Sequence, residues 1–276
     1  MRIDAHQHYW KLDRGDYDWI TQELAALQRD FLPNDLRPHL EKHQLDGTIV
    51  VQAAETLAES DYLLGLAETN DSILGVVVWL DLTDPEYLAH YERFSRHPKF
   101  AGFRIMIQGM SDASRILEAS FVEAVRYFAK RDVPVDLLVL SHQLGPLVEL
   151  LNRVPDLRGV IDHIAKPRIA EAVLEPWRSQ MVEIARHPTI SCKLSGMVTE
   201  ASHRDWTVEQ FAPYIRHVAD IFGPERLMYG SDWPVCLLSA SYDEVMEVVQ
   251  SALPHHWTQQ DKERLFGWNA KRFYKR

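Results

Sequence analysis

An α/β fold closed as a single (β/α)8 barrel, the TIM-barrel architecture, is what this sequence predicts. Three observations lead to it: short apolar runs recur along the chain, amphipathic stretches separate them, and similar proline-containing junctions precede several of them. The chain has 276 residues, and one such barrel typically occupies about 250 residues. We therefore expect one domain that covers residues 1–276.

The apolar runs are rich in β-branched residues and are mostly continuous, which is typical of strands buried on both faces of a parallel sheet. We expect strands at residues 2–6, 48–52, 74–80, 101–105, 135–140, 159–163, 189–194 and 226–230. Between them the apolar residues have helical spacing, so that Phe121, Ala124, Val125 and Phe128 share one face. Strictly alternating strand and helix units favour parallel strands, and eight such units favour a closed barrel.

The junctions before four of these strands carry a proline just after a helical stretch. These prolines are Pro98, Pro155, Pro188 and Pro224. Because proline cannot continue a helix, each one indicates where a helix stops before the next strand. The repeated prolines therefore support a regular alternation of strand and helix.

An open doubly wound sheet is the alternative fold. Such a sheet usually carries a glycine-rich phosphate loop after its first strand, where this chain has His6-Gln7-His8. Within the barrel, residues 10–32 are expected to form a loop or short helix over the mouth. Residues 266–274 are expected to form a terminal helix that packs outside.

Charge and cysteine usage exclude several classes of protein. A formal net charge of -10 argues against nucleic acid or an anionic membrane as the main partner. The two cysteines, Cys192 and Cys236, form no CxxC pair, which favours a reducing cytoplasm over a disulfide framework. We see no signal peptide and no apolar run of membrane-spanning length. We expect a soluble cytoplasmic protein with a small-molecule partner, and the sequence favours no particular oligomeric state.

Polar residues end nearly every expected strand. In a βα barrel the carboxyl ends of the strands meet at one mouth, so these side chains converge whatever their separation in sequence. The candidates for substrate binding or catalysis are His6, His8, Gln52, Trp79, Arg104, His163, Lys166, Lys193 and Asp232.

His6, His8 and Asp232 are the candidate metal ligands. The two histidines are two residues apart on one extended strand, so both side chains point to the same side. Paired imidazoles can bind a divalent metal or hydrogen-bond a substrate oxygen. Asp232 can accept a proton from water or bind a metal. Alternatively, it could only cap the helix that follows it. One zinc ion and a metal-free pocket both remain open.

Four motifs extend the pattern: IDAHQHYW from residue 3, DHIAKP from residue 162, CKLSGMVTE from residue 192 and YGSDWPVC from residue 229. Together they resemble the amidohydrolase superfamily, of the amidohydrolase 2 type, in its sugar-lactonase branch of L-fuconolactonase and L-rhamnonolactonase relatives. The resemblance covers nearly the whole chain. It implies a (β/α)8 barrel and hydrolysis of aldonolactones in sugar catabolism.

The resemblance also assigns residues. The family's first-strand histidines fall on His6 and His8, its sixth-strand histidine on His163 and its eighth-strand aspartate on Asp232. Arg104 stands where binuclear members carry a bridging lysine, so a two-metal site is not expected.

Two further departures bear on the substrate and on the fifth strand. Ile105 follows Arg104 where many lactonase relatives have a histidine. His142 lies slightly past the expected end of the fifth strand.

These residues predict a lactonase mechanism. Asp232 would be the general base for water, while His6, His8 and His163, with or without one metal, would polarise the lactone carbonyl. Arg104 would assist them. The substrate-binding residues would be Gln52, Trp79, Lys166 and Lys193. The alternatives are a metal-dependent decarboxylase that uses the same histidines and aspartate, and a non-catalytic barrel that binds a sugar acid.

Overall fold

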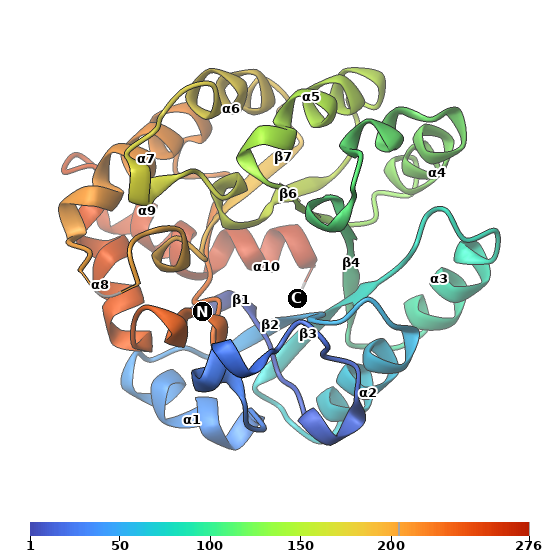
Figure 1. Cartoon of the computed structure of the whole chain (residues 1–276), viewed down its shortest axis with the longest axis horizontal. Coiled ribbons are helices and arrows are strands. Elements are labelled where there is room, and N and C mark those ends of the chain that lie inside the picture. Colours follow the sequence, from blue (N-terminus) through green and yellow to red (C-terminus); the bar gives the residue numbers. More distant parts are fainter. Residues whose placement is uncertain (204, 276) are drawn as a thin grey trace.

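Eight parallel strands follow one another in chain order around a barrel, with helices outside it (Figure 1). The computed structural model describes residues 1–203 and 205–275. The strands are β1 (Ile3–Gln7), β2 (Gly47–Val51), β3 (Ile73–Trp79), β4 (Phe100–Met106), β5 (Val135–Leu138), β6 (Gly159–Ile161), β7 (Ile190–Leu194) and β8 (Leu227–Tyr229). Each overlaps the range expected for it, with ends that differ by at most two residues. The predicted (β/α)8 fold is therefore confirmed.

Backbone contacts between β1 and the segment after β8 close the ring. The amide of Asp232 donates to the carbonyl of His6 (2.8 Å), and the amide of His8 donates to the carbonyl of Trp233 (2.7 Å). The closure thus joins the two segments that carry the candidate ligands. It also explains why His8 and Asp232, 224 positions apart in sequence, face one cavity.

One helix follows each strand, as the proline junctions predict, and two more helices follow near the C-terminus. They are α1 (Pro33–Lys42), α2 (Leu57–Glu68), α3 (Tyr87–Ser95), α4 (Ala119–Ala129), α5 (Leu144–Arg153), α6 (Trp177–Ala185), α7 (Val208–Phe222), α8 (Tyr242–Ala252), α9 (Gln259–Glu263) and α10 (Asn269–Tyr274). Buried faces of these helices and outward strand residues form the larger apolar core. Among the described residues, no helix is long and apolar enough to cross a membrane.

The loop expected at residues 10–32 is present. It contains two short 3-10 helices, Leu12–Arg14 and Gln22–Leu27. The amide of Trp10 donates to the carbonyl of Phe31 (3.0 Å), which joins the two ends of the loop. Part of this loop lines the cavity described below.

The terminal helix lies elsewhere than expected. Instead of packing outside the barrel, α10 covers its amino end, and Figure 1 shows it crossing the middle of the ring. Ala270, Phe273 and Tyr274 belong to a separate buried cluster with apolar strand residues of the barrel interior. Those strand residues are Ile3, Ala5, Ile49, Val51, Val77, Ala101, Val160 and Met228. Helical periodicity identifies an apolar face but not the surface that it covers, so the sequence pattern could not place α10.

Candidate active site

A cavity of about 370 Å³ opens at the carboxyl ends of the strands. Five of the predicted site residues line it: His8, Arg104, His163, Lys166 and Asp232. The barrel brings these side chains together from strands β1, β4, β6 and β8 or the turns after them. Convergence at the strand ends, the central expectation from the sequence, is confirmed for these residues.

A bulge in β1 sets the positions of the two histidines, of which His8 lines the cavity and His6 is fully buried beside it. The pairing register between β1 and β2 shifts between Asp4 and Gln7, and such a bulge redirects the side chains beyond it. The His6 and His8 rings then lie with centroids 5.0 Å apart. Gly230 makes room for His6, because a Cβ at position 230 would lie 2.6 Å from the Cβ of His6.

Three imidazoles surround one carboxylate oxygen. Asp232 Oδ1 lies 3.2 Å from His8 Nε2 and 3.8 Å from the Nε2 atoms of both His6 and His163. His8 Nδ1 lies 2.8 Å from the carbonyl of Val51. A carbonyl only accepts, so that nitrogen carries the proton in a neutral ring, and His8 Nε2 turns a lone pair toward the carboxylate. Two acceptors at that distance require a proton or a cation between them.

Burial sets the charge of these groups. Desolvation lowers the pKa of His6 and of His163 well below the usual range, and the nearby ammonium of Lys193 lowers that of His6 further. Burial acts to raise the pKa of Asp232, but His163 and His8 outweigh it and the pKa is lowered. At neutral pH we therefore expect neutral rings at His6 and His163 beside an ionised carboxylate.

This donor set fits a metal ion. Ligand atoms of His6, His8 and Asp232 lie within 4.8 Å of one another, as do those of His6, Asp162 and His163. His6 Nε2 is buried and has no hydrogen-bond partner among the described residues. Neutral imidazoles with a carboxylate are ligands that zinc and similar divalent ions accept. The site can hold a metal.

Both His163 and Asp232 have left-handed backbones, with φ of 53° and 56°. The turn after β6 continues this conformation through Ile164, Ala165 and Lys166. It is rare for a β-branched residue such as Ile164, and strain of this kind costs on the order of 1–3 kcal/mol per residue. Strained turns of this kind gather at functional sites, and this one follows directly from a strand that ends at the cavity.

Gly196 leaves room for the His163 imidazole, and substitution of Gly196 tests whether the position of this ring matters for activity. A Cβ at residue 196 would lie 2.6 Å from His163 Cγ, at a backbone φ of 59°. We expect Gly196→Ala to displace the imidazole and reduce turnover on the order of 100-fold. Gly223→Ala is the matched control, because Gly223 has a similar φ of 67° but nothing within 4 Å of the new Cβ. Equal losses of activity in both variants, measured alongside melting temperatures, would contradict this role.

Lys193 lies beneath the cavity rather than in its lining. Its side chain is fully buried, with Nζ 3.1 Å from His6 Nδ1 and 3.1 Å from Asp162 Oδ1, and it also pairs with Asp136. Burial acts to raise the pKa of Asp162, yet Lys193, His6 and then Arg104 lower it well below its usual range. The structure thus places Lys193 behind His6, away from where a substrate would bind.

Two other predicted substrate contacts also lie outside the cavity lining. Gln52 is buried behind Arg104 and accepts a hydrogen bond from its guanidinium through Oε1 (2.6 Å). Trp79 lines an adjoining cavity of about 270 Å³, which shares Glu55 with the main cavity. His142 is exposed in the turn Ser141–Gln143 and lines neither of these two cavities.

Sequence reasoning missed several lining residues, namely Asp16, Asp18, Glu55, Met106, Gln108, Leu138 and Val235. The loop expected over the mouth was the available signal for the first two, but the pattern could not show which of its side chains point inward. Buried Glu59 anchors the neighbouring turn by accepting from the amides of Ala53 (2.9 Å) and Ala54 (2.9 Å). Trp19 Nε1 then donates to the carbonyl of Ala53 (2.8 Å), which ties the covering loop to that turn.

Glu59 makes this anchor sensitive to pH. Burial raises its pKa to about 7, although the Ala54 and Ala53 amides act to lower it. The folded state therefore holds a proton that the unfolded state releases near pH 4.5, so stability falls as pH rises through this interval. Glutamine does not titrate, so we expect the free energy of unfolding of Glu59→Gln, relative to that of wild type, to increase as the pH rises from 5 to 8. Urea unfolding measures this difference. Glu23→Gln, at an exposed carboxylate of the covering loop, is the control. A pH-independent difference for Glu59→Gln would contradict the raised pKa.

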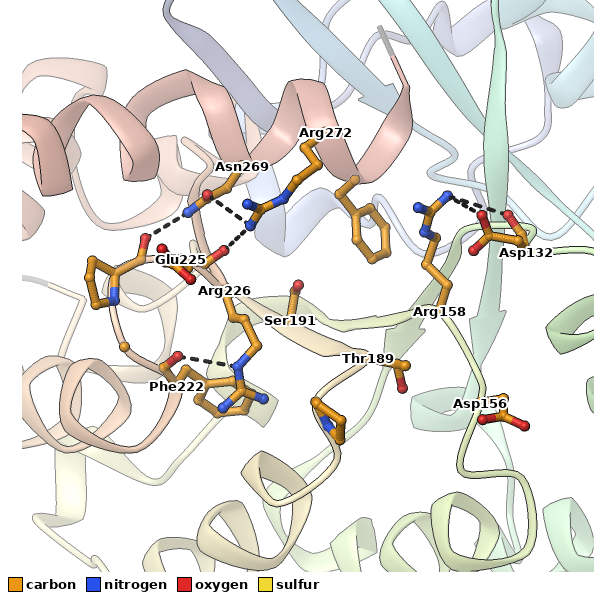
Figure 2. Close-up of a pocket in the computed structure, with 14 residues that line it drawn as sticks. Asp132, Asp156, Arg158, Thr189, Ser191, Phe222, Glu225, Arg226, Asn269 and Arg272 are labelled. Carbon is orange, nitrogen blue, oxygen red and sulfur yellow. Dashed lines mark hydrogen bonds and ion pairs between the residues drawn. The ribbon is translucent and has the colours of Figure 1, made fainter.

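A larger cavity, about 750 Å³, lies at the amino end of the barrel (Figure 2). The arginines that line it already have partners: Arg158 contacts Asp132 at 3.1 Å, Arg226 donates to the carbonyls of His187 and Ile190, and Arg272 donates to Asn269 and to the carbonyl of Glu225. These contacts fasten α10 and the loops beneath the strands. In barrels of this kind the amino end serves stability, so we assign the chemistry to the opposite end.

Comparison with known proteins agrees with this geometry. The family model described as amidohydrolase matches residues 3–276. Two L-fucono-1,5-lactonases, from Burkholderia ambifaria and Burkholderia multivorans, are each 38% identical to this chain, over 100% and 99% of it and 96% of each relative. The solved structure of an amidohydrolase from Burkholderia multivorans with bound zinc has a TM-score of 0.94 at 37% identity. That match covers 100% of this chain and 99% of the other.

Proposed function

The chain belongs to the amidohydrolase family, and we propose that it hydrolyses a sugar lactone, such as L-fucono-1,5-lactone, to the sugar acid. Identity of 38% over the whole chain to two L-fucono-1,5-lactonases supports this substrate class. The observation that carries the proposal is the buried carboxylate of Asp232, which faces three imidazoles at the cavity. We further propose that the enzyme acts in cytoplasmic sugar catabolism.

The charge of the cavity favours a neutral substrate. The carboxylates that line it are those of Asp16, Asp18, Glu55 and Asp232, and the cationic groups are those of Arg104 and Lys166. A divalent metal at His6, His8 and Asp232 would bring these charges close to balance, so the cavity offers no excess of positive charge to attract an anionic substrate, such as the carboxylate that a decarboxylase must bind. A lactone enters uncharged and leaves as an anion, so the cavity also has no excess of positive charge to retain the product.

In the proposed mechanism Asp232 is the general base. Its Oδ1 faces the imidazoles, which leaves Oδ2 to take a proton from the attacking water. Arg104 and Lys166 would hydrogen-bond substrate oxygens as the carbonyl becomes an oxyanion. Asp232 would then return the proton to the ring oxygen as the ester bond breaks.

His6, His8 and Asp232 would hold one divalent metal, which we propose to be zinc. When bound, the ion supplies Lewis-acid polarisation of the lactone carbonyl. The bound zinc of the Burkholderia multivorans amidohydrolase supports this choice. His163 would complete the wall of imidazoles beside it. We expect chelation to abolish activity and one equivalent of zinc to restore it, and full activity of a metal-free sample would contradict this.

A panel of purified lactones, monitored by proton release, tests the proposed function. We expect base consumption with 1,5-lactones of deoxyhexoses and no release of carbon dioxide. Carbon dioxide from an aromatic acid, without lactone hydrolysis, would instead identify a decarboxylase. Tight lactone binding without turnover would identify a binding protein.

A further inference from the structure

A chain of buried contacts joins the C-terminal helix to the active site from below. The hydroxyl of Tyr274, on α10, donates to Asp136 Oδ1 (2.7 Å). The other oxygen of Asp136 pairs with Lys193, and Lys193 in turn lies 3.1 Å from both His6 Nδ1 and Asp162 Oδ1. Tyr274 is 2% exposed and the other four residues are fully buried.

We propose that Tyr274 is a positioning residue of the active site, acting on His6 through Asp136 and Lys193. It touches neither the cavity nor the candidate metal ligands. Its hydroxyl fixes the carboxylate of Asp136, and this carboxylate holds the ammonium of Lys193 at its place beneath the imidazole.

The position of Lys193 affects which nitrogen of the His6 ring carries the proton. That nitrogen has one donor, Lys193 Nζ at 3.1 Å, and one acceptor, Asp162 Oδ1 at 3.2 Å. The relative position of the two decides whether Nδ1 or Nε2 carries the ring proton. It thereby decides whether Nε2 presents a lone pair or an N–H to Asp232.

Packing alone does not account for such a cluster. Its neighbours on the adjoining strands are apolar: Val160 pairs with Asp136, and Met228 pairs with Lys193. Buried ion pairs give little or no net stability over a well-packed apolar layer, because both partners lose their hydration. The charged layer lies directly beneath the cavity and ends at a candidate metal ligand, which is where control of orientation matters.

Nitrogen-15 NMR of the histidine side chains in the full-length, zinc-free protein tests this inference. The signals of His6 would be assigned by their loss in His6→Asn. We expect Tyr274→Phe to shift them, because the variant removes one hydroxyl and frees Asp136. We also expect about a tenfold loss of zinc affinity in chelator competition. The kcat should fall while KM stays within about twofold.

Lys275→Ala is the matched control. It removes the exposed ion pair between Lys275 and Asp132 (2.8 Å), one residue from Tyr274, without touching the buried chain. We expect this variant to keep wild-type His6 signals. Asp136→Asn, one link closer to His6, should move the same signals further than Tyr274→Phe does.

The inference rests on the proposed site but not on the proposed substrate. Unchanged His6 signals in Tyr274→Phe would overturn it, whatever Asp136→Asn does and even if the wild-type protein hydrolyses lactones. Shifted signals in a protein that hydrolyses no lactone would support it while the proposed function fails. Equal shifts in Lys275→Ala would also overturn it, because they would reflect movement of α10 as a whole.

Discussion

Replacing Asp232 with asparagine is expected to lower kcat by about 10²–10⁴-fold while the protein remains folded. Asparagine has nearly the same size, so the backbone contact with His6 and the surrounding imidazoles can persist. Its amide cannot take a proton from water, and it lacks the negative charge that a metal ligand supplies. The measurement is steady-state kinetics with a purified sugar lactone, alongside circular dichroism and the melting temperature.

Asp18→Asn is the matched control for this prediction. Asp18 also lines the cavity, but it comes from the covering loop. We expect a change in KM with a far smaller change in kcat. Near-normal turnover by Asp232→Asn, or an equal loss of kcat in both variants, would rule out Asp232 as the base.

The second large effect that we expect is on stability: Lys193→Met should destabilise the fold by about 3–5 kcal/mol. The substitution leaves Asp136 and Asp162 buried without their shared cation. Urea unfolding monitored by tryptophan fluorescence measures the loss.

Lys275→Ala breaks an exposed ion pair with Asp132 and should cost less than about 1 kcal/mol. Each substitution removes one ammonium, so the two variants separate the effect of burial from the loss of a charge. A loss for Lys193→Met no larger than that for Lys275→Ala would contradict the buried network.

Much of the barrel could be predicted because parallel strands buried on both faces leave continuous apolar runs. The residues at the ends of those runs then identify the mouth without any knowledge of packing. This is why His8, His163 and Asp232, far apart in sequence, were expected together and do lie together.

The apolar runs do not show how far along the barrel axis a side chain lies, nor which backbone conformation a residue adopts. Lys193 and Arg104 both end apolar strands in sequence, yet Lys193 lies beneath the cavity and Arg104 lines it. The bulge in β1 and the left-handed turn at His163 are features of backbone conformation that no run of apolar residues marks. Placement of Tyr274 inside the barrel likewise requires knowing which surface α10 covers.

The central claim is that Asp232 drives hydrolysis of an uncharged sugar lactone at the carboxyl end of the barrel. Proton release on mixing the zinc-loaded protein with L-fucono-1,5-lactone, compared between wild type and Asp232→Asn, tests it most directly. The account predicts rapid release of one proton per lactone by wild type and a rate near the spontaneous one for the variant. Release at the spontaneous rate with both proteins, across a panel of sugar lactones, would contradict it.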